Sequence, residues 1–200
     1  MITELMDQCS PDWFKARCGI PTASNFGKIL SPTGKPSTQA VKYAYQLAGE
    51  RITGIKEEGY SNANMQAGID REEEGRNFFE FAQGVTLTQV GICYPNERKE
   101  YSCSPDSLIL DAEEGFEQKN PIITTQVEYL LAGKLPTIYI PQVQGSMLIT
   151  GYKAWWFLSY YPSLKPLIIR VERDEKYIEL LKTAIYKFNK ELDDIVKKIR

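Results

Sequence analysis

Histidine is absent from this 200-residue sequence, and its four cysteines form no C-x-x-C pair. Without histidine, serine–histidine and cysteine–histidine catalysis is excluded, because the usual general base is missing. We expect no zinc and no iron–sulfur cluster, since such sites draw on histidine or on closely spaced cysteines. An enzyme of this composition must therefore rely on carboxylates, lysine and a metal that prefers oxygen ligands.

The sequence also lacks long apolar runs and the N-terminal pattern of a signal peptide. No stretch of about 18 apolar residues occurs, so no membrane span is expected. The first residues, Met1 to Leu5, lack the basic and apolar regions of a signal peptide, which predicts a cytoplasmic protein. With 42% apolar and 25% charged residues, the chain predicts one globular domain over residues 1–200.

The formal net charge of −2 argues against a protein that coats nucleic acid by bulk attraction. The charge is unevenly distributed, however, because between Lys15 and Lys56 seven basic residues stand against one acid, Glu50. This local excess predicts a confined groove for phosphate, although a solvated basic helix face gives the same pattern.

The apolar periodicity predicts an α/β fold with a mixed central β-sheet flanked by α-helices. Helices are expected from residue 10 and over 22–30, 37–53, 64–82, 124–132 and 137–149. Strands are expected over 85–94, 100–103, 108–110, 116–120, 154–161 and 167–172. A C-terminal amphipathic helix over about 174–199 has a narrow apolar seam, which more often packs on its own domain than on a partner. In the 37–53 helix, Val41 and Tyr45 are expected to face the core beside Leu47 and Ala48.

Two short segments indicate metal chemistry: Ser104-Pro105-Asp106 and, after a turn, Glu117-Gln118-Lys119. On neighbouring strands the two carboxylates would offer hard oxygen ligands to Mg²⁺, which keeps several of its waters. The two-residue period of a strand puts Glu117 and Lys119 on one face and turns Gln118 away. The ammonium group can hold an attacking water in line, as a magnesium-dependent phosphodiesterase requires. A solvent-facing hairpin can carry the same residues, so this motif alone does not decide the function.

Four further sequence blocks accompany this motif in a fixed order. They are Trp13-x-x-x-Arg17-x-Gly19 with Thr22-Ala23-Ser24, Gly68-x-x-x-Glu72 with Arg76, Gln142-Val143-Gln144-Gly145-Ser146-Met147, and Ala154-Trp155-Trp156-Phe157 leading to Tyr177. Together the blocks resemble the lambda exonuclease family, also described as YqaJ-type viral recombinases, within the PD-(D/E)xK nucleases. The resemblance runs from about Trp13 to Tyr177.

The resemblance implies a restriction-endonuclease-like core and a magnesium-dependent 5′→3′ exonuclease. Such an enzyme degrades one strand of linear double-stranded DNA from a 5′-phosphate end and leaves 3′ single-stranded overhangs, and Mn²⁺ is expected to substitute for Mg²⁺. The resemblance also implies a toroidal homotrimer that is phage or prophage encoded. It would work in the cytoplasm of a bacterial host beside a single-strand annealing recombinase.

The family's metal site carries over position by position. Asp106 and Glu117 correspond to the metal ligands, with the backbone carbonyl of Gln118 as a third ligand. Lys119 corresponds to the catalytic lysine and Glu72 to an additional acid at the metal. The sequence departs from the family at Gln118, where an apolar residue is common.

The family's 5′-phosphate pocket corresponds to four polar residues: Arg17, Ser24, Ser104 and Gln142. A guanidinium with hydroxyl and amide donors suits a terminal phosphate. From the residues alone, Arg17 could equally form a surface ion pair, Ser24 could be a helix serine or cap, and Gln142 could lie at the core edge. Met65 aligns with an apolar strand-separating wedge, and a core methionine is the equal alternative. Trp13, Trp155 and Trp156 are expected to pack in the core.

Two other functions are compatible with the sequence. A restriction-type endonuclease could use the same core, although no separate recognition domain is visible in the sequence. A non-catalytic DNA-end-binding protein with a decayed site is the other alternative. The joint presence of Asp106, Glu117 and Lys119 argues against decay.

Overall fold

The computed structural model describes residues 1–56 and 71–200. Its central sheet has the strand order β3-β4-β5-β6. The strands are β3 (Ser107–Ile109), β4 (Glu114–Lys119), β5 (Ala154–Ser159) and β6 (Leu167–Glu172). Strands β4 and β5 run parallel and the other two pairs run antiparallel, so the sheet is mixed. A second, two-stranded sheet pairs β1 (Ile2–Glu4) with β2 (Ile92–Tyr94).

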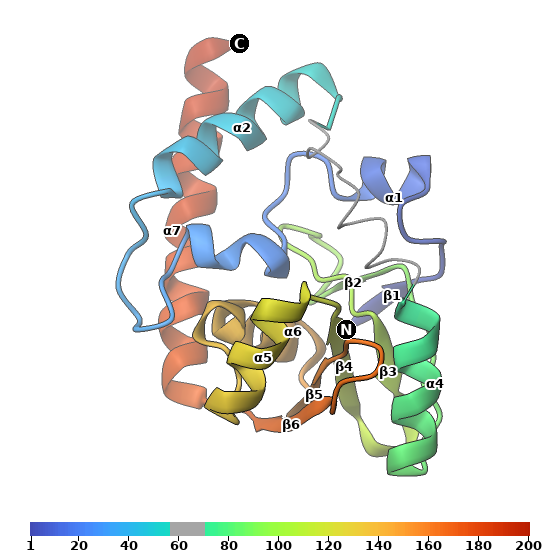
Figure 1. Ribbon diagram of the computed structural model, residues 1–200. Helices are drawn as coiled ribbons and strands as arrows, with labels where there is room; N and C mark the ends of the chain where they lie inside the picture. The colour runs from blue at the N-terminus through green and yellow to red at the C-terminus, as the bar shows by residue number, and fades with distance from the viewer. Residues whose placement is uncertain (57–70) are drawn as a thin grey trace.

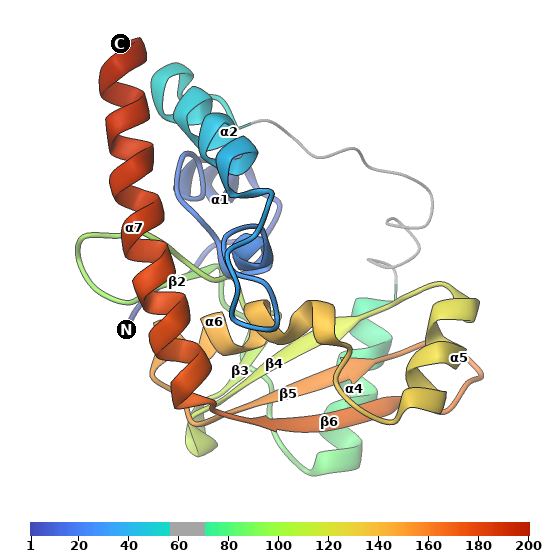
Figure 2. The ribbon, with the colours of Figure 1, turned by 90° about the vertical axis from the view of Figure 1, so that its left-hand side faces the viewer.

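Helices cover both faces of the central sheet, with α6 over one face and α4 over the other (Figure 2). The helices are α1 (Pro11–Ala16), α2 (Ala40–Thr53), α4 (Glu72–Gln83), α5 (Ile123–Ala132), α6 (Ile140–Thr150) and α7 (Glu175–Ile199). Short 3₁₀ segments are η1 (Ala23–Lys28), η2 (Leu110–Ala112) and η3 (Thr137–Tyr139). The expected α/β class with a mixed, helix-flanked sheet is therefore confirmed. In the part of the chain that the structure describes, no helix is long and apolar enough to cross a bilayer.

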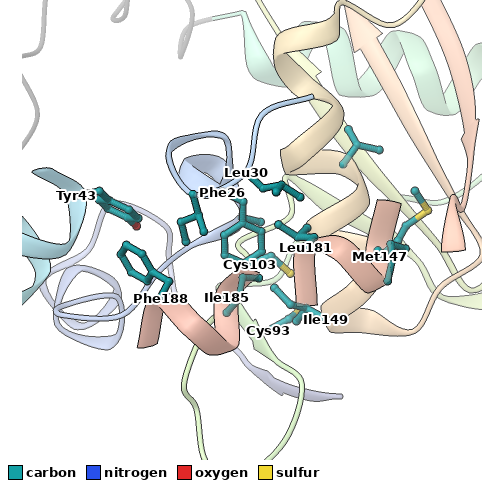
Figure 3. Close-up of a cluster of buried hydrophobic side chains, with 14 of the residues drawn as sticks. Phe26, Leu30, Tyr43, Cys93, Cys103, Met147, Ile149, Leu181, Ile185 and Phe188 are labelled. Carbon is teal, nitrogen blue, oxygen red and sulfur yellow. The ribbon is translucent and has the colours of Figure 1, made fainter. Parts of the chain in front are cut away.

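The long helix α7 runs past α2 and the sheet and closes the main core (Figure 1). Its seam residues Ile178, Leu181, Ile185, Phe188 and Leu192 are all buried, whereas Ile199 near the end is exposed. Figure 3 shows part of this seam packed among side chains from η1, α6 and the β2 region. The Phe188 ring stacks on Tyr43 of α2, with 5.5 Å between ring centroids. The seam therefore packs on its own chain, as the more common interpretation predicted.

A smaller core separates the sheet from α4. Phe79 of α4 lies on Phe116 of β4, with 4.6 Å between ring centroids, and Leu158 of β5 belongs to the same cluster. Since strand side chains alternate between faces, Phe116 on the α4 face puts Glu117 on the α6 face. This alternation fixes the direction of the acidic side chain.

One expected strand is shorter in the structure than the sequence indicates, and another is absent. Of residues 85–94, only Ile92–Tyr94 forms a strand, and of residues 100–103 only Ser102 and Cys103 form isolated bridges. Ser102 bridges to Thr22, whereas its neighbour Cys103 bridges to Cys93. Because successive residues pair with different segments, no continuous ladder develops there.

The expected orientation of Val41 and Tyr45 in α2 is wrong, because these side chains are 58% and 61% exposed. Helix α2 packs on α7 through Tyr43, Ala44, Leu47 and Ala48, and this spacing leaves positions 41 and 45 on the outer flank. The helix also begins at Ala40 rather than near residue 37. For the helix expected over 64–82, the described part begins at Glu72, and residues 64–70 lie outside the described residues.

Candidate active site

The hairpin of β3 and β4 brings the two central carboxylates together. Ser107 pairs with Phe116 in the antiparallel register, so Asp106, one residue before the strand, lies opposite Glu117. The Gln118 backbone N–H donates to Asp106 Oδ2 at 2.6 Å, which fixes this carboxylate against β4. The acids at the ends of two neighbouring strands thus meet at one end of the hairpin.

Glu117 is buried between its own strand and α6. Its Oε1 atom accepts from the Lys119 ammonium and, at 2.6 Å, from Nε2 of Gln142 on α6. Lys119 Nζ also lies 5.5 Å from the centre of the Tyr139 ring, and its side chain keeps 27% exposure. The ammonium is therefore held at Glu117 while it remains accessible from outside.

The protonation of this cluster reflects crowded negative charge. Burial, followed by the charge of Asp106, raises the pKa of the Glu117 carboxyl to about 7. Burial also raises the pKa of Asp106, although Lys119 and the Gln118 N–H oppose this effect. Burial would lower the pKa of Lys119, but Glu117 and Asp106 outweigh it, so the pKa lies above its usual range. The positive charge of one lysine does not fully compensate the negative charge of the two buried acids.

A cleft of about 800 Å³ opens beside Asp106. Glu72 and Arg76 from the first turns of α4 line it together with Asp106 and the N-terminal residues 5–9. Burial and the charge of Asp106 raise the pKa of Glu72, while Arg76 and Lys119 lower it. Glu72 therefore lies near enough to Asp106 to act electrostatically on the same centre.

A hard divalent cation fits this donor set. The described residues contain no group of three or more His, Cys, Asp or Glu side chains arranged to hold a metal. Two carboxylates and a backbone carbonyl would leave most coordination positions to water, as Mg²⁺ prefers. A cation between Asp106 and Glu117 would also relieve the repulsion that raises the pKa of Glu117.

Gln118 points to the opposite side of the sheet and packs against α4. Its Nε2 atom donates to the Arg71 carbonyl at 3.2 Å and to Asn120 Oδ1 at 2.9 Å. A Cβ atom at Gly75 would lie only 2.1 Å from that nitrogen, so α4 approaches the strand without a side chain between them. The polar residue at this position ties β4 to the start of the helix that carries Glu72.

Arg17 forms the centre of a second polar cluster. It is only 8% exposed, and its NH1 donates to Ser104 Oγ at 2.8 Å while NH2 lies 3.4 Å from Ser24 Oγ. The Trp13 ring lies beneath the guanidinium, with 4.1 Å from Cζ to the ring centroid. Within residues 1–56 and 71–200, the Nε atom has no hydrogen-bond partner. Burial lowers the pKa of this guanidinium. Among the residues that the structure describes, no carboxylate forms a hydrogen bond with it.

The hydroxyl proton of Ser104 remains available to a ligand. The Ser104 hydroxyl accepts from Arg17 and, at 3.0 Å, from the Trp13 indole N–H. Both partners are obligate donors, so the hydroxyl proton of Ser104 can be donated elsewhere. The cluster thus presents a cation and a hydroxyl donor together, which is what a phosphate group requires.

The structure brings most of the sequence-predicted residues into these two clusters. Asp106, Glu117, Lys119 and Gln142 meet at the hairpin, with Glu72 across the cleft; Arg17, Ser24 and Ser104 form the second cluster. The Gln142 side chain contacts Glu117 rather than the Arg17 cluster. Met65 lies outside the described residues.

Sequence reasoning missed the role of Trp13, which is a half-buried platform for Arg17 rather than a core residue. Its spacing of four residues from Arg17, one helical turn, was the available signal. Arg76 was named only as part of a sequence block, without its place at the cleft, and Tyr139 beside the lysine was missed. Both contacts depend on packing between distant segments. Trp155 is fully buried, as expected.

Comparison with known families decides the classification. The YqaJ-like viral recombinase domain matches residues 12–153. The chain belongs to this family. The resemblance indicated by the sequence blocks is thereby confirmed, and the match spans both the Arg17 cluster and the carboxylates. The comparison with curated proteins finds no match.

Solved structures resemble this YqaJ-family protein over nearly its whole length. The alkaline exonuclease LHK-Exo from Laribacter hongkongensis shares 29% identity with a TM-score of 0.86, covering 95% of this chain and 96% of that one. The same exonuclease in complex with dAMP matches equally well, at 30% identity over 95% and 96% of the two chains with a TM-score of 0.86. A phage-related exonuclease from Haemophilus somnus 129PT shares the fold, at 16% identity, 90% and 96% coverage and a TM-score of 0.70. Family and fold together indicate a nuclease of the alkaline exonuclease type.

Proposed function

We propose that this protein is a Mg²⁺-dependent exonuclease that degrades the 5′-terminated strand of linear duplex DNA and leaves 3′ single-stranded overhangs. The observation that carries this proposal is the short connection between the two clusters. Ser104 belongs to the Arg17 cluster and Asp106 to the carboxylates, and only Pro105 separates them. Two residues of extended chain span roughly 7 Å. A terminal phosphate held at Arg17 would therefore place the adjoining phosphodiester beside Asp106 and Glu117.

The residues of the carboxylate cluster would hold the metal and prepare the attack. Asp106 and Glu117 would bind Mg²⁺, with the Gln118 carbonyl as a third ligand and Glu72 across the cleft; Mn²⁺ should substitute. The bound ion would neutralise charge on the scissile phosphate and promote ionisation of the attacking water. Lys119 would orient that water through its ammonium, which Glu117 already holds in place. Gln142 would steady Glu117 through its amide.

Replacement of Arg17 by alanine should reduce the preference for 5′-phosphorylated ends by about tenfold to a hundredfold, the worth of one charge-assisted contact. The reason is that Arg17 is the only group of the cluster with a full positive charge among the described residues, and it has no carboxylate in contact. The measurement is initial digestion of matched linear duplexes with 5′-phosphate or 5′-hydroxyl ends. Arg98→Ala, at an exposed turn, serves as the control. Equal digestion of both ends by the wild-type protein would show that the pocket is misassigned.

We further propose a closed homotrimeric ring around the duplex. Two separate helices expose apolar stripes, Val41, Tyr45 and Ile52 on α2 and Ile123, Val127 and Leu131 on α5. The two helices lie on different parts of the molecule (Figure 2). A ring requires two different faces of each subunit that contact one another head to tail, and exposed apolar stripes favour such contacts. A ring would also retain DNA on a chain whose net charge is −2.

Light scattering at micromolar concentration should give the mass of three subunits for the wild-type protein. Val127→Glu places a charge in the middle of the α5 stripe and should yield monomers. Phe81→Glu alters another exposed apolar residue, 90% exposed on α4, and should leave the assembly intact. A wild-type monomer that remains processive on long linear DNA would refute the ring.

The product of such an enzyme indicates which partner protein would use it. A 3′ single strand is the substrate of a single-strand annealing recombinase, so we propose such a recombinase as the partner. The family description, a viral recombinase domain, supports a phage or prophage gene that acts in the bacterial cytoplasm.

A further inference from the structure

The turn between α1 and η1 is held by two consecutive residues of α2. The Gly19 N–H donates to Glu50 Oε2 at 2.9 Å, and the Gly19 carbonyl accepts from Arg51 Nε at 2.7 Å. We propose that Glu50 and Arg51 are positioning residues that set the selectivity for a 5′-phosphate by fixing this turn and, through it, Arg17. The inference rests on the proposed role of Arg17 as the phosphate-binding residue.

The contact between Gly19 and α2 is too close for any other residue. Gly19 has a φ of +71°, and a Cβ atom there would lie 2.5 Å from Arg51 Cγ and 3.2 Å from the Arg51 backbone nitrogen. Glu50 is 3% exposed, and its carboxylate also accepts from Gln46 and Lys56. The other end of the Arg51 guanidinium bonds Asp193 of α7 at 2.5 Å. The two side chains that hold the turn are therefore themselves fixed, Glu50 by Gln46 and Lys56 and Arg51 by α7.

Arg17 depends on this grip because its own contacts are weak. Its guanidinium contacts two hydroxyls and an indole ring, and none of these fixes its direction as a carboxylate would. Helix α1 has six residues, too few to be rigid alone. Ser24 lies beyond the turn, in η1. The contacts of Glu50 and Arg51 with Gly19, which we call the Gly19 clamp, thus set the separation of Arg17 and Ser24. These are two of the side chains that should meet the terminal phosphate.

Arg51→Ala should lower the preference for a 5′-phosphate by about threefold to tenfold, as expected for one lost hydrogen bond. The measurement is fluorescence anisotropy of short duplexes with 5′-phosphate or 5′-hydroxyl ends in EDTA, where no cleavage occurs. Arg51→Lys, which keeps the charge and one donor, should recover part of the preference. In an Arg17→Ala background, Arg51→Ala should cause no further loss, because both changes act through the same group. If Arg51→Ala is too unstable to test, Glu50→Gln, which weakens the anchor through lost charge, takes its place.

Arg170→Ala is the matched control, since this arginine also bonds two different residues, Glu114 and Glu172, but on the sheet rather than at the turn. It should leave the preference unchanged even if it lowers the melting temperature. A wild-type preference retained in Arg51→Ala, or equal weakening of both duplexes, would overturn the positioning role. Absence of any preference in the wild-type protein would instead refute the phosphate pocket itself.

Discussion

Replacement of Asp106 by asparagine is expected to abolish cleavage and to leave duplex binding largely intact. Asparagine keeps an acceptor for the Gln118 N–H, which bonds Asp106 at 2.6 Å, so the hairpin should fold normally. The lost charge removes one of two carboxylates that would hold the metal. Metal-ion catalysis contributes several kcal/mol of transition-state stabilisation, which corresponds to about a thousandfold or more in rate. Binding should persist because phosphate contacts do not require this carboxylate.

Single-turnover digestion in saturating Mg²⁺ measures the rate, and anisotropy in EDTA measures binding. Glu117→Gln should behave like Asp106→Asn, because we propose Glu117 as the other carboxylate ligand of the same metal ion. Glu114→Gln is the control, because Glu114 lies on the same strand but bonds Trp156 and Arg170 instead. A rate near the wild-type value for Asp106→Asn would show that the hairpin does not hold the catalytic metal.

Replacement of Lys119 by alanine should lower the cleavage rate by about 10²–10³-fold, the usual loss when one positioned hydrogen-bond donor is removed from an active site. Its ammonium contacts Glu117 and remains 27% exposed toward the outside, so it can reach an attacking water. Removing it takes no ligand from the metal. The concentration of Mg²⁺ that gives half-maximal rate should therefore change much less than the rate itself.

Mg²⁺ titrations of the cleavage rate separate these two effects. Lys153→Ala, an exposed lysine just before β5, should match the wild-type protein in both quantities. A Lys119→Ala protein with full rate but greatly weakened Mg²⁺ dependence would show that the lysine organises the carboxylates and does not act in the chemical step.

The central hairpin could be predicted from sequence because its signals are local. Acidic residues bracket a turn, and the alternation of β4 determines that Glu117 and Lys119 share a face. The seam of α7 was equally readable, since a long regular period outweighs local ambiguity. The exposed side chains of Val41 and Tyr45 could not be predicted, because α2 carries apolar residues on more than one flank and packing alone selects the buried one.

The Arg17 cluster shows where sequence reasoning stops. The residue types suited phosphate, yet their meeting depends on a chain path that links residues 13–24 to Ser104. Neither the Gly19 clamp nor the contact of Gln142 with Glu117 follows any sequence period, since each joins segments at least 25 residues apart. Such contacts are set by how α2 and α6 pack, which only the fold determines.

The most direct measurement is strand digestion of two duplexes by the wild-type protein. One is linear with a single 5′-phosphate end, and the other is covalently closed and circular. We expect Mg²⁺-dependent loss of the 5′-phosphorylated strand from the linear duplex and no cleavage of the circle. We expect neither duplex to be digested in EDTA or by the Asp106→Asn protein. Cleavage of the circle at a comparable rate, or digestion in EDTA, would contradict a metal-dependent exonuclease that begins at a 5′ end.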